Sequence, residues 1–333
     1  MILLKPDYYD AFRCLASRCP DSCCQLWDVE IDADTEKLYK NVPGALGKLL
    51  QDDLYQEDGC TYLRFGADGR CPMWRPDGLC RVQAELGEEA LSHVCKTFPR
   101  LSHDFGDFEE LGLELSCPEA ARLILTADSH NWITAQLPEG DDPDYDHEAM
   151  AILKATRQTA RRILTEKAPS PAQALARLLV YGYQAQGELD GEPISPFDGG
   201  KALDIARSMA EPSDGEALRN FFLDMEIMTQ EWKTLLTRPE TPRPWCAEER
   251  NLALYFVDRY WLQAVSDYDL VSRVKLAVTS TLLIHLLGGE LLRTAQLFSK
   301  EVENDADNID ALLDGAYDSP AMTDARLLGL LLA

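Results

Sequence analysis

The sequence is poor in basic residues: 32 lysines and arginines stand against 57 aspartates and glutamates, so the formal net charge is −25. A surface this acidic repels the phosphates of nucleic acids and of anionic lipids. We therefore expect neither a nucleic acid nor a membrane surface as partner. A basic or neutral protein, or a small molecule, suits this charge better, although charge that serves only solubility would look the same.

The sequence also lacks a long apolar run. The apolar residues before Pro6 are too few for the core of a signal peptide. The most apolar stretch, residues 276–287, is interrupted by His285 and is shorter than the roughly 18–20 residues that span a membrane. We therefore expect a cytoplasmic protein without a membrane span, in a compartment that keeps thiols reduced.

Cysteine, in contrast, is abundant and unevenly placed. Nine of the ten cysteines lie in residues 14–117, and only Cys246 lies elsewhere. In a cytoplasmic chain of this size, such density indicates metal ligation rather than disulfides. Thiolates three to five residues apart can bind one ion from a single loop, and later cysteines then complete the coordination. The predicted metal ligands are Cys14, Cys19, Cys23, Cys24, Cys71, Cys80, Cys95 and Cys117.

The spacing of these cysteines favours an iron–sulfur cluster, most simply 4Fe-4S, with zinc as the alternative. No Cys-x2-Cys pair occurs, although this is the usual spacing of structural zinc knuckles. Cys19, Cys71 and Cys117 each precede proline, as does the last ligand of bacterial ferredoxins. His93 and His103 are possible further ligands, but surface or capping roles are commoner for histidine. Cys60 and Cys246 stand outside the pattern, and we expect them to be buried free thiols.

The fold class predicted is mainly α, with a small cysteine-rich, metal-bound domain in residues 1–125 that contains a short β hairpin. Residues 60–65 and 70–74 flank a Gly66–Gly69 turn and are predicted to form this hairpin. Residues 108–116 are predicted to be extended, and residues 34–39 and 82–94 to be short helices. A helix is expected near Glu119, because Pro118 suits a first helical turn.

Residues 147–333 are predicted to form an α-helical bundle, after an acidic boundary at 139–146. Ser213-x-x-Glu216 has the spacing of a capping box. A proline-rich break is expected at 238–245, and Gly288-Gly289 is expected to end a helix that begins near residue 270. Further helices are predicted at 247–263, 290–303 and 307–331, the last with a break near Pro320.

The first 125 residues resemble the flagellin lysine N-methylases, which belong to a wider set of proteins with a Cys-Cys-rich zinc- or iron-chelating domain. The motifs that carry the resemblance are Phe12-x-Cys14, Cys19-x-Asp21-x-Cys23-Cys24-x2-Trp27, Cys71-Pro72, Leu79-Cys80, Leu86-Gly87, Cys95-x2-Phe98-Pro99-Arg100 and Leu115-Ser116-Cys117-Pro118-Glu119. The resemblance implies methyl transfer from S-adenosylmethionine to the ε-amine of lysines on flagellin.

The sequence departs from that family and from common methyltransferases in three ways. The family often has Gly before the Trp, where this chain has Leu26. No Gly-x-Gly-x-Gly follows a predicted strand, so no Rossmann-type donor site is predicted. Cys19-x3-Cys23 is followed at once by Cys24, which does not fit the Cys-x3-Cys-x2-Cys of radical enzymes.

Catalytic and donor-binding residues are therefore not predicted from the sequence. Tyr255, Tyr260 and Glu249 are conceivable tunnel residues, but the apolar neighbours of Tyr255 favour a core position. The alternative function is a non-enzymatic zinc or iron–sulfur protein for storage, sensing or scaffolding, because the cysteines are the strongest signal in the chain.

Overall fold

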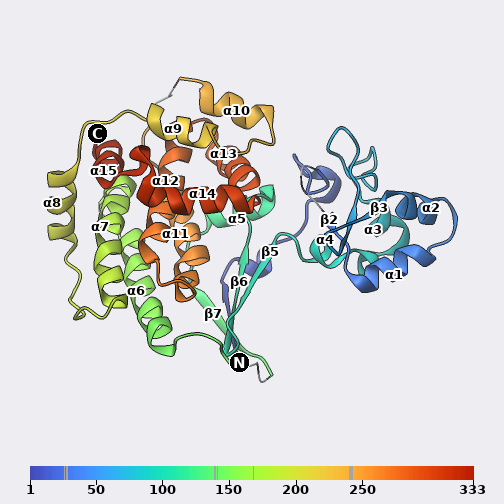
Figure 1. Cartoon of the computed structure of the whole chain (residues 1–333), viewed down its shortest axis with the longest axis horizontal. Helices are drawn as coiled ribbons and strands as arrows, with labels where there is room; N and C mark the ends of the chain where they lie inside the picture. Colours follow the sequence, from blue (N-terminus) through green and yellow to red (C-terminus); the bar gives the residue numbers. More distant parts are fainter. Residues whose placement is uncertain (26, 28, 139, 141, 168, 240–242) are drawn as a thin grey trace.

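The computed structural model describes residues 1–25, 27, 29–138, 140, 142–167, 169–239 and 243–333. Leu26 lies outside these residues, as do Glu139 of the predicted acidic boundary and residues 240–242 of the predicted proline-rich break. Figure 1 shows two packed parts, a region around helices α1 to α4 and a larger helical bundle, with a β-sheet beside the bundle.

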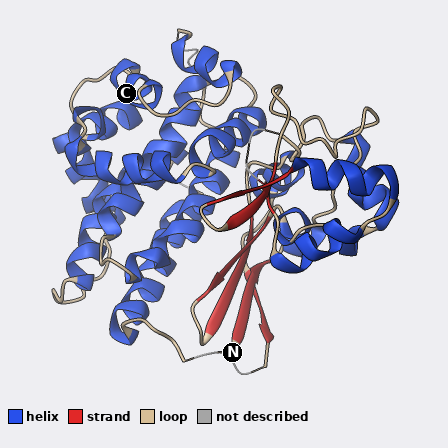
Figure 2. Ribbon diagram, turned by 45° about the vertical axis from the view of Figure 1, so that its right-hand side comes forward, coloured by secondary structure: helices blue, strands red, loops and turns tan. Residues whose placement is uncertain are grey.

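A four-stranded sheet joins segments from the first 136 residues in the order β5-β6-β1-β7. Its strands are β1 (Ile2–Pro6), β5 (Arg100–Asp104), β6 (Phe108–Leu113) and β7 (Trp132–Gln136). Strand β1 runs parallel to β6, with Leu3 opposite Glu109, and antiparallel to β7. Figure 2 shows its long strands next to the bundle. The prediction of an extended segment at 108–116 is thus confirmed for its first six residues.

A smaller sheet, in the order β2-β4-β3, lies in the cysteine-rich region. It contains β2 (Val29–Glu30), β3 (Leu54–Glu57) and β4 (Cys60–Leu63), and it packs with α1 (Ala33–Asn41), α2 (Gly44–Asp53), α3 (Arg81–Leu86) and α4 (His93–Thr97). The hairpin predicted from residues 60–65 and 70–74 is wrong in its pairing. The partner of β4 is the preceding β3, because a tight turn at Asp58-Gly59, both with positive φ, brings these two strands together.

Residues 70–74 form no strand, although a turn at Gly66–Gly69 is present. Arg70 and Trp74 make only isolated bridges, to Gln25 and Cys80. The helix predicted at 34–39 is confirmed as α1, whereas the one predicted at 82–94 is divided into α3, a 3-10 turn (Glu88–Ala90) and α4. Gly87, with φ of 93°, ends α3.

Asp32 caps α1 and ties it to α4. Its carboxylate accepts hydrogen bonds from the Thr35 N–H at 3.0 Å and from the His93 N–H at 2.9 Å. The bond from His93 is the largest cause that holds the pKa of Asp32 at about 2, below its ordinary value. The stabilisation is therefore complete above the unfolded pKa of about 4, and it is lost as the pH falls towards 2.

Asp32→Ala is expected to lower the free energy of unfolding by about 1–2 kcal/mol, since it removes an N-cap and a second backbone contact. Asp34→Ala is the matched control: Asp34 lies two residues away, and its exposed ion pair with Lys37 contributes little. Urea unfolding at pH 7 compares the two. Equal losses would mean that the Asp32 contacts contribute no more than an exposed charge.

The helical bundle uses most of the remaining chain, as predicted. Its helices are α5 (Pro118–Thr126), α6 (His147–Thr165), α7 (Pro171–Leu189), α8 (Gly199–Met209), α9 (Glu216–Leu223), α10 (Gln230–Thr237), α11 (Glu248–Tyr260), α12 (Leu270–Leu287), α13 (Leu291–Phe298), α14 (Ala306–Asp318) and α15 (Asp324–Leu332). Helix α12 is long and apolar enough to cross a membrane by length and composition alone. It is 89% buried inside the protein, as the core helix of a soluble protein would be.

Several local signals are confirmed and one is not. Pro118 opens α5, Gly288 ends α12 with φ of 62°, and a break around Pro320 separates α14 from α15. The capping box at Ser213 is wrong: the cap of α9 is Gly215, and the Ser213 hydroxyl donates instead to the Glu211 carbonyl. The Ser213 side chain therefore stabilises a local turn instead of capping α9.

The buried apolar side chains fall into two clusters. One, centred on Val29, Leu50, Met73 and Val82, belongs to the cysteine-rich region. The other extends through the bundle and includes Phe12 and Phe108 from the N-terminal third of the chain. The division into residues 1–125 and 147–333 as domains stays a prediction, because shared burial does not show which segments fold alone.

Candidate active site where the cysteine loop meets the helical bundle

The cysteines predicted as ligands lie mostly on loops or at helix ends. Cys14, Cys19, Cys23 and Cys24 follow one another along the loop before β2, and Cys71 lies in the turns after β4. Cys80 and Cys117 are the N-cap residues of α3 and α5, and Cys95 lies within α4. None of these eight cysteines lies within a named β-strand, and short loops or helix ends position their thiols.

The structure brings the eight thiols into two adjoining groups. In the first, Cys19 interacts electrostatically with Cys14 and Cys23, and Cys117 interacts with Cys19 and Cys23. In the second, Cys24 is hydrogen-bonded to Cys71 and lies near Cys80, which also interacts with Cys95. Neighbouring Cys23 and Cys24, themselves hydrogen-bonded, join the two groups.

Several thiols of this cluster have a raised pKa, which favours their protonated form. Burial is the largest cause that raises the pKa of Cys117 to about 12. For Cys24, the hydrogen bond with Cys23 lowers the pKa, but the bond with Cys71 and burial raise it to about 12. Any metal that binds here must therefore displace protons from the thiols.

The donor set suits a thiophilic metal, but the ligand set stays a prediction. Soft thiolates are the ligands preferred by zinc and by iron–sulfur clusters. Within the described part of the chain, however, no group of three or more Cys, His, Asp or Glu side chains is arranged to hold a metal ion. The identity of the metal likewise stays open between iron–sulfur and zinc.

The cysteines and histidines outside the predicted ligand set lie on other elements. Cys60 begins β4, and Cys246 precedes α11, where its N–H donates to Glu249 at 2.8 Å. The His93 N–H donates to Asp32. His103 lies on β5 and lines a cavity between the four-stranded sheet and α11. These positions associate His103 with the sheet rather than with the cysteine loop.

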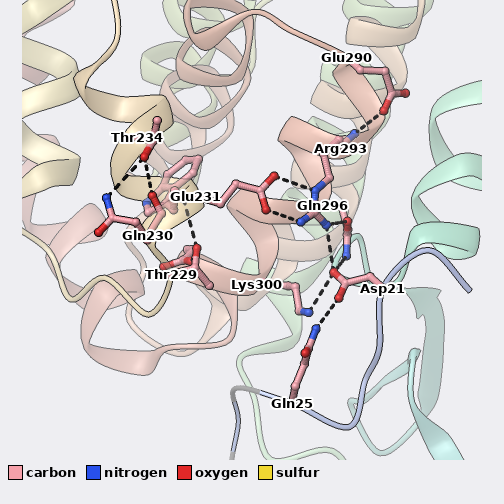
Figure 3. Close-up of polar contacts among 12 residues, drawn as sticks. Asp21, Gln25, Thr229, Gln230, Glu231, Thr234, Glu290, Arg293, Gln296 and Lys300 are labelled. Atoms are coloured by element: carbon pink, nitrogen blue, oxygen red, sulfur yellow. Dashed lines mark hydrogen bonds and ion pairs between the residues drawn. The ribbon is translucent and has the colours of Figure 1, made fainter. Parts of the chain in front are cut away.

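Asp21, between Cys19 and Cys23, fastens the cysteine loop to the bundle (Figure 3). Its Oδ2 accepts hydrogen bonds from Arg293 at 3.0 Å, Gln296 at 2.7 Å and Lys300 at 3.1 Å. Burial alone would raise the pKa of Asp21, but Lys300 and the hydrogen bonds outweigh it and hold this pKa at about 2. We call this contact the Asp21 clasp: Asp21 with Arg293, Gln296 and Lys300.

Asp21→Asn is expected to lower the free energy of unfolding by about 2–3 kcal/mol, because it weakens several hydrogen bonds to charged groups and leaves the partly buried Lys300 without its counter-charge. The matched control is Asp68→Asn, an exposed aspartate in a turn of the same region, which should change stability by under about 0.5 kcal/mol. Urea unfolding distinguishes the two. A loss no larger than that of the control would show that the clasp is only a surface contact.

A π-helical turn, Ser299–Glu303, supplies Lys300 to the clasp and a second carboxylate to the interior. Glu303 accepts hydrogen bonds from Tyr255 at 3.0 Å and Tyr260 at 2.9 Å, and it pairs with Arg259 at 3.3 Å. Turns of this kind recur at functional sites. Tyr255 is buried, as predicted, and so is Tyr260, but both hydroxyls belong to this polar network.

A small cavity, partly open to solvent, adjoins the clasp. The cysteine loop and the residues near α4 supply an aromatic wall, in which Trp27 meets Phe98 edge to face at 4.7 Å between ring centroids. The rest of its lining is polar or flexible: Cys23, Gln25, Ser116, Met228, Thr229, Lys300 and Asn304. We refer to this space as the loop cavity.

A second small cavity, also partly open to solvent, lies between the four-stranded sheet and α11. Its walls include His103, Trp132, Tyr255 and Asp258. We refer to it as the sheet cavity. Neither cavity was predicted from the sequence, because their walls come from segments more than 100 residues apart. The one local signal for the loop cavity was Asp21 within the cysteine motif.

Comparison with known proteins finds relatives that match about a third of the chain. Flagellar biosynthetic protein FliU of Salmonella muenchen is 35% identical over 127 residues, which are 36% of this chain and 75% of that protein. The lysine-N-methylases of Salmonella choleraesuis and Salmonella typhimurium are 35% and 34% identical over 127 residues. There the match covers 36% of this chain and only 32% of either relative. No family model and no solved structure matches the chain.

Proposed function

Because the chain belongs to the flagellin lysine N-methylase family, we propose that it is an S-adenosylmethionine-dependent methyltransferase acting on lysines of flagellin. The observation that carries the proposal is the match to relatives named lysine-N-methylase and flagellar biosynthetic protein. The activity, donor and substrate are proposals, since the match spans about a third of the two lysine-N-methylases.

The proposed reaction is a direct displacement. The lone pair of a neutral lysine amine forms a bond to the methyl carbon of the sulfonium donor. The carbon–sulfur bond breaks, its electrons return to sulfur, and the donor leaves as a neutral thioether. The protein must align the two reactants, which contributes much of the rate, and must favour the neutral amine by desolvation.

Two features of the loop cavity support a donor site there. Trp27 and Phe98 offer aromatic surface for a flat heterocycle. Gln25 and Asn304 offer amide groups for its polar edge. We therefore place the donor in the loop cavity, where the Asp21 clasp fixes one wall against the other.

We further propose that cysteines among the predicted eight hold an iron–sulfur cluster, 4Fe-4S, with zinc as the alternative; either group takes four ligands. When bound, this group would supply folding free energy to the cysteine-rich region. The loop that it orders also carries Asp21 and Trp27, so it would shape the loop cavity. The chain would act in the cytoplasm, where thiols remain available to metals.

Methylation of monomeric flagellin tests the function. Purified protein with excess S-adenosylmethionine should yield flagellin lysines heavier by one or more methyl groups, detected by mass spectrometry. The rate should fall as salt rises, because an enzyme of charge −25 attracts lysine-rich regions and the Debye length shrinks to about 8 Å at physiological ionic strength.

Unmodified flagellin, with intact metal-loaded protein and donor in excess, would contradict the proposal. It would favour the alternative of a non-enzymatic metal protein for storage, sensing or scaffolding. Calorimetry with S-adenosylmethionine separates the two further, since a methyltransferase must bind this donor and a storage protein need not.

A further inference from the structure

The sheet cavity is built from segments that the proposed function has not yet used. Strands β1, β5, β6 and β7 form one wall, and α11 forms the other. Its Tyr255 donates to Glu303, and the next residue, Asn304, lines the loop cavity. Adjacent residues of the chain, Glu303 and Asn304, are thus associated with the two cavities.

The lining of the sheet cavity suits a long apolar side chain. Aromatic surface comes from Tyr8, Trp132 and Tyr255, and aliphatic surface from Leu101 and Leu113. Rigid aromatic side chains of this kind contact methylene groups over a large area at little entropic cost. This part of the lining therefore suits a narrow alkyl chain.

Two buried polar atoms of this lining lack partners among the described residues. Asp258 uses Oδ2 to bind Arg161, but its Oδ1 accepts no hydrogen bond, and Nε1 of Trp132 donates none. Buried groups of this kind are rarely left unpaired, and a ligand is one explanation. Asp258 Oδ1 can accept from an amine, and Trp132 Nε1 can donate to a carbonyl oxygen.

The pKa of His103 indicates how the surroundings of this cavity affect a positive charge. Burial first, and then the guanidinium of Arg259, lower the pKa of His103, with Arg157 acting in the same direction and Glu110 opposing it. The other charged or titratable groups of the lining are Asp258, which is paired with Arg161, and the buried phenols of Tyr8 and Tyr255. A positive charge placed beside His103 meets the same burial and the same arginines, so a neutral base is favoured.

We propose that the sheet cavity binds the substrate lysine, with its methylene groups between Tyr8, Trp132 and Tyr255 and its neutral amine at Oδ1 of Asp258. This inference rests on the proposed methyl transfer, in which the amine must come into contact with the methyl group of the donor. The lysine ammonium loses its proton to water as it enters. After the nitrogen–carbon bond forms and the carbon–sulfur bond breaks, the methylated ammonium gives up a proton to water as it leaves.

Filling the cavity tests the assignment. A Cβ added at Gly112 would meet Leu101 at 3.8 Å, an ordinary contact, so Gly112→Ala fits and Gly112→Leu extends into the space. We expect Gly112→Leu to raise KM for flagellin by about tenfold or more and Gly112→Ala by less, with the Kd for S-adenosylmethionine unchanged by calorimetry. Ser102→Leu is the matched control, because Ser102 is an exposed residue of β5 bonded to Glu109 on the outer face.

The outcomes separate this inference from the function on which it rests. Wild-type kinetics in folded Gly112→Leu and Gly112→Ala would overturn the cavity assignment and leave the methyltransferase proposal standing. Loss of S-adenosylmethionine binding in Gly112→Ala would also overturn it, since the cavity would then hold the donor. Absence of methylation by the wild-type protein, with donor bound, would instead overturn the proposed function.

Discussion

Cys23→Ser and Cys71→Ser are each expected to remove most of the bound metal and, with it, the methyltransferase activity. Serine replaces a soft thiolate with a hydroxyl that binds these metals weakly. The free energy of metal binding, about 10–16 kcal/mol in small zinc domains, is also folding free energy. Cys71 is buried, and its N–H donates to the Cys24 carbonyl at 2.9 Å, so disorder at one position spreads to the other.

Iron, sulfide and zinc analysis of anaerobically purified protein measures this effect, together with the broad absorption near about 400 nm that iron–sulfur clusters produce. Cys246→Ser is the control and should keep full metal content. The circular dichroism of the bundle should survive in all three variants, because most of its core is separate from that of the cysteine-rich region.

Two results would change the metal assignment. Full metal in Cys23→Ser and Cys71→Ser would mean that neither thiol is needed to bind the metal, and it would contradict the predicted ligand set. Colourless wild-type protein with stoichiometric zinc and no sulfide would contradict the iron–sulfur cluster and support zinc.

Glu303→Ala is expected to lower the free energy of unfolding by about 3–5 kcal/mol, as breaking a buried ion pair typically does. The side chain of Glu303 is fully buried in its pair with Arg259, whose own side chain is 14% exposed. The substitution leaves this guanidinium without its counter-charge and removes the acceptor of the Tyr260 hydroxyl at 2.9 Å. Chemical denaturation of the whole chain measures the loss.

The matched controls separate charge from general damage. Glu57→Ala, at an exposed position of β3, should change stability by less than about 0.5 kcal/mol. The double variant Glu303→Leu with Arg259→Met should recover much of the loss, since apolar replacement of both partners removes the unpaired charge. Additive losses in the double variant would show that the two side chains are not energetically coupled.

The candidate site was predictable where the signal lies within a few residues. The spacing of the cysteines set eight thiols apart from Cys60 and Cys246, and their role as metal ligands stays a prediction. The loop cavity and the sheet cavity were not predictable. Each is lined by residues far apart in the sequence, such as Trp27 with Lys300 and His103 with Asp258, whose proximity no local pattern encodes.

By itself, the sequence determined the helical bundle, the cysteine-rich region and the ends of elements that depend on one residue's backbone. Pro118 starts α5 because it has no N–H to leave unpaired, and Gly288 ends α12 because it adopts positive φ readily. Only the tertiary structure decided which segments meet. Strand β4 pairs with β3 rather than with residues 70–74, β1 pairs with a strand over 100 residues away, and Asp21 binds cations of α13 and the π-turn. Strand pairing and ion pairs depend on which partners burial brings within reach, and that is a property of the whole fold.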